Sequence, residues 1–115
     1  MAPDITKSLE IIKTMESYIS RVRPRQEIRH QVDITYEIED QSIILKEIRP
    51  SLSNSDRTIT RAYAKATFIY QKNIYKIYWN RPDNKWHSYE PAAMVSRLED
   101  FLKIVDEDKH YCFKG

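Results

Sequence analysis

The stretch IRHQVDITYEI at residues 28–38 decides the fold class, because its side chains change character at every second position. The odd positions are polar or charged, whereas the even positions carry Ile28, His30, Val32, Ile34, Tyr36 and Ile38. Successive side chains of a strand point to opposite faces of a sheet. The pattern therefore predicts a strand over 28–38 that buries one face and exposes the other.

Further strands are predicted at 43–49, 59–70, 74–79 and 85–89. The stretch at 43–49 has apolar side chains on both faces, which is typical of an interior strand. The polar segment PSLSNSD at 50–56 predicts a loop. Because no helical pattern separates these strands, we expect an antiparallel meander of four to five strands.

The turns of this meander must do without glycine, because the only glycine is Gly115. Asparagine and aspartate tolerate positive φ, which predicts turns at 40–41, 72–73 and 83–84. A two-residue turn at 72–73 would pair Ala66 with Trp79 and Phe68 with Ile77. We expect helices to cover the sheet face that carries Ala62, Ala64, Ala66, Phe68, Ile77 and Trp79, and the opposite face to be basic and rich in tyrosine.

Two helices flank the strands in the predicted order. Residues 4–22 form the first, with Asp4 or Thr6 as its cap, Pro24 beyond its end, and a stripe of Ile5, Leu9, Ile12, Met15, Ile19 and Val22. Pro91 opens the second, over 91–105, whose inner face carries Val95, Leu98, Phe101, Leu102 and Val105. With a tail at 106–115, the chain is predicted to be a single α+β domain over 1–115.

Composition narrows the class of protein further. Hydrophobic residues at 41% and charged residues at 31% are ordinary for a folded globular domain. The net charge of +2 is too small to imply a polyanionic partner. The single Cys112 cannot form an internal disulfide, and no run approaches the ~18 apolar residues of a membrane span. We therefore expect a cytoplasmic protein that does not enter the membrane.

Three segments resemble a known family: LKEIRP at 45–50, IYWNRPDNKWHSYEP at 77–91 and VDEDKHYCFKG at 105–115. Together they are similar to the small bacterial family called domain of unknown function 3024. The resemblance implies a stand-alone domain with no assigned activity. It marks as motif positions Glu47, Arg49, Trp79, Trp86, His87, Tyr89, Asp106 and Phe113. Lys109 and Tyr111 depart from the pattern, which has a proline and a small residue there.

A candidate pocket involves the motif residues of the central strands. Glu47 and Arg49 share a strand face, and a three-residue loop in the last hairpin would place His87 opposite Trp79. A four-residue loop would bring Trp86 to that side instead. The candidate pocket comprises Glu47, Arg49, Trp79, Trp86, His87 and Tyr89. It is either a small catalytic site with His87 as base or a structural ion pair beside a core histidine.

The sequence lacks the residue patterns that metal and cofactor sites require. His110 and Cys112 follow Asp106 and Asp108 closely, but zinc usually takes paired ligand spacings, and the second pair is missing. A chain whose only glycine is its last residue contains no Gly-rich phosphate loop. We therefore predict neither a metal site nor a cofactor.

The remaining candidate is a basic and aromatic surface on the outer side of the sheet. Its predicted members are Arg61, Tyr63, Lys65, Lys76 and Tyr78. Such residues stack bases and follow phosphates on open sheets, although they are also common on solvated strands. We favour a non-enzymatic binding or accessory module with a protein partner, or a homo-oligomer. Nucleic-acid binding and a small enzyme built on Glu47, Arg49 and His87 are the alternatives.

Overall fold

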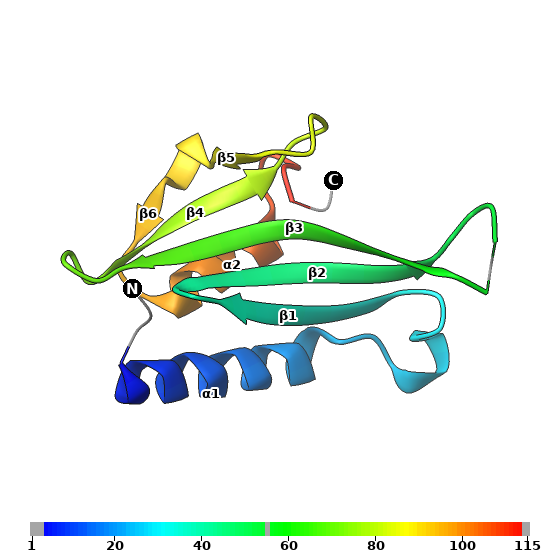
Figure 1. Ribbon diagram of the computed structural model, residues 1–115, viewed down its shortest axis with the longest axis horizontal. Helices are drawn as coiled ribbons and strands as arrows, with labels where there is room; N and C mark the ends of the chain where they lie inside the picture. The colour runs from blue at the N-terminus through cyan, green and yellow to red at the C-terminus, as the bar shows by residue number, and fades with distance from the viewer. Residues whose placement is uncertain (1–3, 55, 114–115) are drawn as a thin grey trace.

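The computed structural model of the protein describes residues 4–54 and 56–113. Helix α1 (Ile5–Val22) and a 3-10 turn (Gln26–Ile28) precede strands β1 (Asp33–Glu39), β2 (Ser42–Pro50), β3 (Thr58–Ile69) and β4 (Ile74–Asn80). After them come β5 (Trp86–Ser88), a second 3-10 turn (Glu90–Ala92), β6 (Met94–Val95) and helix α2 (Leu98–Glu107) (Figure 1). The predicted α+β class with an antiparallel sheet is confirmed.

The sheet has the strand order β1-β2-β3-β4-β5, and every pair is antiparallel. Strand β6 also pairs with β4, so β5 and β6 form one interrupted edge strand. The interruption contains Pro91, which has no N–H to give to a ladder. Hydrogen bonds bridge the gap, because Tyr89 N–H donates to Ile77 O at 2.9 Å and Ile77 N–H donates to Ala93 O at 2.9 Å.

The predicted start of the second helix at Pro91 is wrong. Pro91 lies in a 3-10 turn and Val95 lies in β6, so α2 begins only at Leu98. Backbone pairing with β4 outweighs the helical spacing of these few apolar residues. The predicted inner face is otherwise confirmed, since α2 buries Leu98, Phe101, Leu102 and Val105.

The N-terminal half of the predicted first strand is also not a strand. β1 begins at Asp33, and residues 26–31 form a 3-10 turn and further turns that contain His30. The register pairs Asp33 with Ile48, so a longer β1 would soon lie opposite Pro50, which cannot donate a ladder hydrogen bond. Local bonds replace the ladder there: Gln31 N–H donates to Ile28 O at 2.9 Å.

Helix α1 has the predicted bounds and cap, because the Asp4 side chain accepts a hydrogen bond from Lys7 N–H at 2.8 Å. Its buried stripe, however, is Ile11, Met15 and Tyr18. Ile5, Leu9 and Ile12 of the predicted stripe are 79%, 62% and 41% exposed. The helix is turned so that the Tyr18 ring is buried while its hydroxyl bonds to Asp106 on α2, at 2.7 Å.

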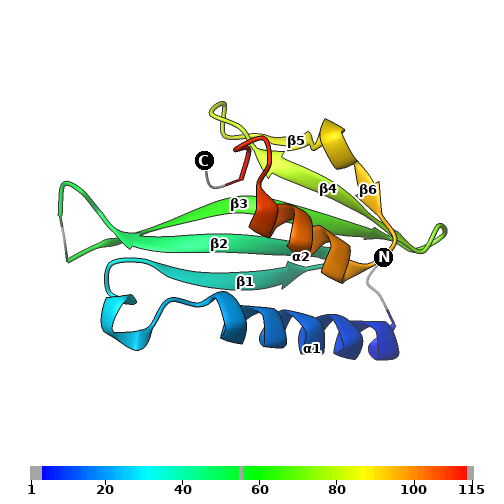
Figure 2. The ribbon, with the colours of Figure 1, turned by 180° about the vertical axis from the view of Figure 1, so that it is seen from behind.

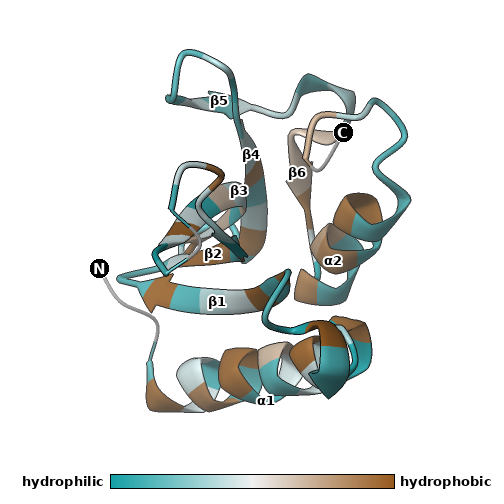
Figure 3. Cartoon of the chain, turned by 90° about the vertical axis from the view of Figure 1, so that its right-hand side faces the viewer, coloured by the Kyte–Doolittle hydropathy of each residue, from teal (hydrophilic) through white to brown (hydrophobic). Residues whose placement is uncertain are grey.

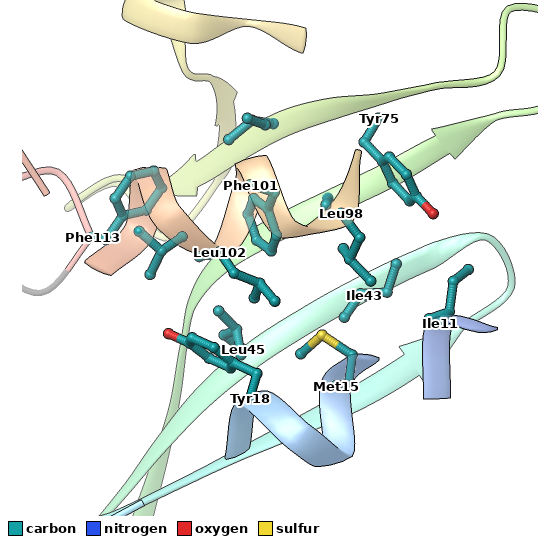
Figure 4. Close-up of a cluster of buried hydrophobic side chains, with 14 of the residues drawn as sticks. Ile11, Met15, Tyr18, Ile43, Leu45, Tyr75, Leu98, Phe101, Leu102 and Phe113 are labelled. Carbon is teal, nitrogen blue, oxygen red and sulfur yellow. The ribbon is translucent and has the colours of Figure 1, made fainter. Parts of the chain in front are cut away.

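The core lies between the two helices and one face of the sheet, which we call the inner face (Figure 4). Figure 4 shows Ile11 and Met15 of α1 and Phe101 of α2 pointing toward strand residues such as Ile43. Four residues of the predicted covered face are buried there: Ala64, Ala66, Phe68 and Ile77. None of the helices within residues 4–54 and 56–113 is long and apolar enough to span a membrane.

The β3–β4 hairpin differs from its predicted register by two residues. Ala64 pairs with Trp79 and Phe68 with Tyr75, because the connection is the longer loop 70–73 rather than a two-residue turn. A shift of two residues leaves each side chain on its predicted face. Positive φ falls on Asp40, Asn73 and Asn84, which confirms that asparagine and aspartate replace glycine in the turns.

A β-bulge divides β3 into two halves. Leu45 pairs with Ala64 while Lys46 pairs with Ala62, so Tyr63 is an extra residue on β3. Beyond this point the alternation reverses, and Arg61 and Tyr63 lie on the inner side while Ala62 lies on the outer side. Tyr63 is 0% exposed. The prediction that Arg61 and Tyr63 lie on the outer face and Ala62 on the inner face is therefore wrong.

Both helices lie away from the second sheet face, which we call the outer face. Figure 2 shows α2 crossing the inner face and α1 running along β1, and Figure 3 shows the same layers end-on, with α2 beside β4 and α1 beneath β1. In the described part of the chain no helix covers the outer face, which is turned toward the viewer in Figure 1.

Candidate functional site

The hairpin between β4 and β5 places Trp79 opposite His87, as predicted for a three-residue loop. Pro82, Asp83 and Asn84 form that loop, with Asn84 at φ 63° and Arg81 N–H donating to Lys85 O at 3.1 Å. The His87 ring pairs with Asp83 Oδ2 at 2.8 Å. This hydrogen bond is the main reason that the pKa of Asp83 is below its usual value.

Glu47 and Arg49 form an ion pair on β2, on the same face as Trp79 and His87 but several strands away. Arg49 Nε donates to Glu47 Oε1 at 2.6 Å, and this bond raises the pKa of Arg49. Glu47 is 9% exposed, whereas the Arg49 side chain is 60% exposed. Burial, followed by the charge of Glu47, raises the pKa of the neighbouring Tyr63. The pair therefore neutralises a buried carboxylate beside the core.

The structure does not bring His87 to this ion pair. Leu45, Ala64, Trp79 and His87 form one row across β2, β3, β4 and β5. With strands about 4.8 Å apart, the ends of that row are roughly 14 Å apart. Glu47 lies two residues further along β2. Direct proton transfer needs hydrogen-bond contact or one bridging water, so these groups do not form a shared catalytic site.

The other members of the candidate pocket lie in two further places. Trp86 lies on the outer face opposite Asn80, on the side away from Trp79 and His87. Tyr89 is 3% exposed, and its ring centroid is 4.8 Å from that of Phe113. Tyr89 and Phe113 thus hold the tail against the sheet. The predicted pocket is divided among four separate places.

A cleft does exist at the end of the sheet where the tail returns, and we call it the end cleft. It encloses about 550 Å³ and is lined by Arg61, Trp79, Asn80, Arg81, Pro82, Asn84, Tyr111, Cys112 and Phe113. Burial raises the pKa of the Cys112 thiol. Sequence reasoning missed this cleft because the bulge that turns Arg61 inward leaves no mark on the alternation of residues 59–70.

A second cleft lies between the two helices. It encloses about 520 Å³ and is lined by Lys13, Thr14, Ser17, Tyr18, Arg21, Glu99, Leu102, Lys103 and Asp106. Asp106 accepts the Tyr18 hydroxyl and lies 3.6 Å from Arg21 Nη1. The carboxylate thus ties the helices together. Among the described residues, no three His, Cys, Asp or Glu side chains lie close enough to hold a metal ion.

The outer face carries a cluster of one lysine and two aromatic rings, which we call the cation–aromatic cluster. Lys65 Nζ lies 4.9 Å from the ring centroid of Tyr78 and 4.9 Å from that of Trp86. Burial lowers the pKa of Lys65. Of the predicted nucleic-acid surface, Lys65, Lys76 and Tyr78 lie on this face. Trp86 is the member that sequence reasoning missed, because its side depended on the undetermined loop length.

Comparison with known proteins identifies the family. A match to the family described as Domain of unknown function (DUF3024) extends over residues 2–115 and so covers essentially the whole chain. Comparison with curated proteins and with solved structures gives no match. The match includes the hairpin and tail segments on which the resemblance rests, both of which border the end cleft. The chain belongs to the DUF3024 family.

Proposed function

We propose that the protein is a non-enzymatic binding module and that its outer sheet face binds a protein partner. The observation that carries this proposal is the cation–aromatic cluster on a sheet face with no helix over it among the described elements. Tyrosine and tryptophan are enriched in protein interfaces, where they contribute large contact areas. The cluster extends over β3, β4 and the edge strand β5, and its Lys65 lies beside the 9% exposed Ile44.

The charges on the outer face favour a protein over a nucleic acid. Lys65 and Lys76 lie on β3 and β4, but Glu37 and Glu39 lie on the same face of β1. Lys46 is already paired with Glu37. A phosphate backbone requires a surface of one sign, because nearly all of its non-specific affinity comes from contacts with cations. A surface with both signs suits a partner with both signs.

The partner that this arrangement fits is a second copy of the chain. Glu39, Ser42, Thr67 and Lys76 form one row across the sheet, with an acid at one end and a base at the other. A twofold axis parallel to the strands reverses the row and places Glu39 of each copy over Lys76 of the other. Two sheets related in this way form an aligned sandwich, the common mode of sheet packing.

The size of the face sets the expected affinity. A sheet of this width, at about 4.8 Å per strand and with ~20 Å of paired length, offers roughly 500 Å² per copy. The total of about 1,000 Å² is below the standard range for stable complexes. We therefore expect a reversible dimer with a dissociation constant in the micromolar range, weakened by salt because its ion pairs are at the rim.

Light scattering after size exclusion tests this proposal, at protein concentrations from about 1 to about 200 µM. Lys76→Glu and Glu39→Lys should each shift the protein toward the monomer, and the double variant should restore the dimer because the row is then simply reversed. Lys13→Glu, an exposed lysine on α1, is the control for net charge. A monomer at every concentration, or a dimer that Lys76→Glu leaves unchanged, would contradict the proposal.

A further inference from the structure

We propose that the end cleft binds a small aromatic phosphate, with Arg61 and Arg81 holding the phosphate and the ring lying against Trp79 and Tyr111. The end cleft opens beside the returning tail, and its arginines do not belong to the proposed partner face. The inference is therefore independent of the proposed dimer. Nucleoside monophosphates are the chemical class that fits best.

The fold brings the two arginines to the cleft by two different irregularities. The bulge at Tyr63 reverses the alternation of β3, so that Arg61 reaches the tail and donates from Nη2 to Phe113 O at 3.3 Å. The three-residue loop after β4 leaves Arg81 beside Trp79, with its Cζ 5.3 Å from the ring centroid. Arginine stacked on an aromatic face keeps its N–H groups at the edge of the plane, where they can meet a ligand.

The side chains that line the cleft carry a net positive charge, from Arg61 and Arg81. Of the described residues that line the cleft, none is Asp or Glu. The acids near the cleft each have a partner. Asp83 accepts from His87 and from Lys85 N–H. Glu47, opposite Arg61, accepts from Arg49, and Asp108 accepts from Phe113 N–H. Each guanidinium has five N–H donors, and Arg61 uses one of them on Phe113. Two guanidiniums match the charge of a phosphate monoester and can bind its oxygens in pairs, whereas a carboxylate would use only one of them.

The walls of the cleft suit a ring attached to that phosphate. The Tyr111 side chain is 76% exposed at the cleft, and its backbone has φ 55°, which is unfavourable for a bulky residue. Trp79 and Pro82 supply further apolar surface. The volume of about 550 Å³ falls within the roughly 300–1,000 Å³ of small-molecule sites.

The side chain of Asn80 ties the end of β4 to β3 next to the cleft. Asn80 Nδ2 donates to Ala62 O at 2.9 Å, which fixes the orientation of the side chain. Asn80 Oδ1 is itself buried and offers nothing to a ligand. The base is therefore recognised by stacking against Tyr111 and Trp79, and the phosphate by the two arginines.

The two tryptophans allow a direct test, because Trp79 lies in the cleft and Trp86 on the outer face. Their indole N–H signals in a proton–nitrogen correlation spectrum are assigned with Trp79→Phe and Trp86→Phe. Adenosine monophosphate should shift the Trp79 signal saturably and leave Trp86 in place. Adenosine and inorganic phosphate should each bind about tenfold or more weakly, since each lacks half of the contacts.

Variants of the arginines decide whether the cleft itself binds the nucleotide. Arg81→Gln and Arg61→Gln should each weaken binding about tenfold, and Arg25→Gln, an exposed arginine after α1, should leave it unchanged. Circular dichroism of each variant verifies that it is folded. If Arg61→Gln disrupts the tail, the result for Arg81→Gln decides the test. An unmoved Trp79 signal at about 10 mM nucleotide, equal binding of inorganic phosphate, or equal affinity in all three variants would overturn the proposal.

Discussion

Odd- and even-numbered residues alternate without a break along the sequence of β3, yet the two halves of the strand turn them to opposite faces of the sheet. From Lys65 to the end of the strand, the small and aromatic residues face the helices and the polar ones face outward, as for Phe68 and Thr67. Before the bulge, Tyr63 and Arg61 turn toward the inner side instead. One extra residue separates the two patterns.

This difference determines the character of both candidate surfaces. Without the bulge, Arg61 and Tyr63 would join Lys65 on the outer face and make it a strongly basic, aromatic surface. With the bulge, Arg61 reaches the end cleft and Tyr63 enters the core at 0% exposure. The outer face is left with lysines that are balanced by Glu37 and Glu39. A single irregularity thus separates a positive cleft from a face of mixed charge.

The largest effect that tests this comparison is expected at the bulge itself. Tyr63→Ala should lower the free energy of unfolding by about 3–5 kcal/mol, because it removes a fully buried ring. Phe68→Ala in the regular half should cost a similar amount, whereas Lys65→Ala should cost under about 1 kcal/mol. Urea denaturation measures all three. A small effect of Tyr63→Ala would mean that both halves of β3 keep the same faces.

The elements of the fold could be predicted where side-chain periodicity sets the structure. The bounds of α1, β2, β3 and β4 agree with the sequence to within one residue, because each has a long pattern and a turn residue at its end. The short β6 could not be predicted, since its two residues are placed by backbone pairing with β4. The bulge is hidden for the same reason, because backbone hydrogen bonds carry no trace in the side-chain pattern.

The candidate site shows the same division between local and long-range information. Two registers were compatible with the sequence, and the three-residue loop selects the one in which Trp79 faces His87. The distance from His87 to Glu47 depends on the order of strands between them, which no local pattern contains. The orientation of α1 was missed because Tyr18 was not counted among the apolar residues, although its ring is 2% exposed.

Alkaline pH should destabilise the fold through the buried tyrosines of the inner face, which the outer face lacks. Burial raises the pKa of Tyr75 to about 12, with Glu10 and Glu99 adding to the effect. The folded state then holds this proton more tightly than the unfolded state, so its stabilisation is complete below the unfolded pKa of about 10 and is lost as the pH rises to 12. At about 1.4 kcal/mol per pKa unit, the loss is roughly 2–3 kcal/mol.

Urea denaturation between pH 9 and 12 measures this loss, with tyrosinate absorbance as a second signal. Tyr75→Phe should reduce the slope of stability against pH in that window. Burial also raises the pKa of Tyr36 to about 12, with a hydrogen bond to Glu16, so Tyr36→Phe should reduce the slope as well. A slope that both substitutions leave unchanged would show that these rings ionise freely in the folded protein.

The smallest effect on stability is expected at the contact between the two helices that cover the inner face. Tyr18→Phe keeps the ring but removes the 2.7 Å hydrogen bond to Asp106, and should cost about 1.5 kcal/mol. Asp106→Asn tests the other partner, and the double variant completes a cycle. A coupling energy of about 1 kcal/mol would mean that this bond fixes the rotation of α1. If the two substitutions were additive, burial of the ring alone would set that rotation, and the exposed Ile5, Leu9 and Ile12 would follow from packing rather than from the polar contact between helices.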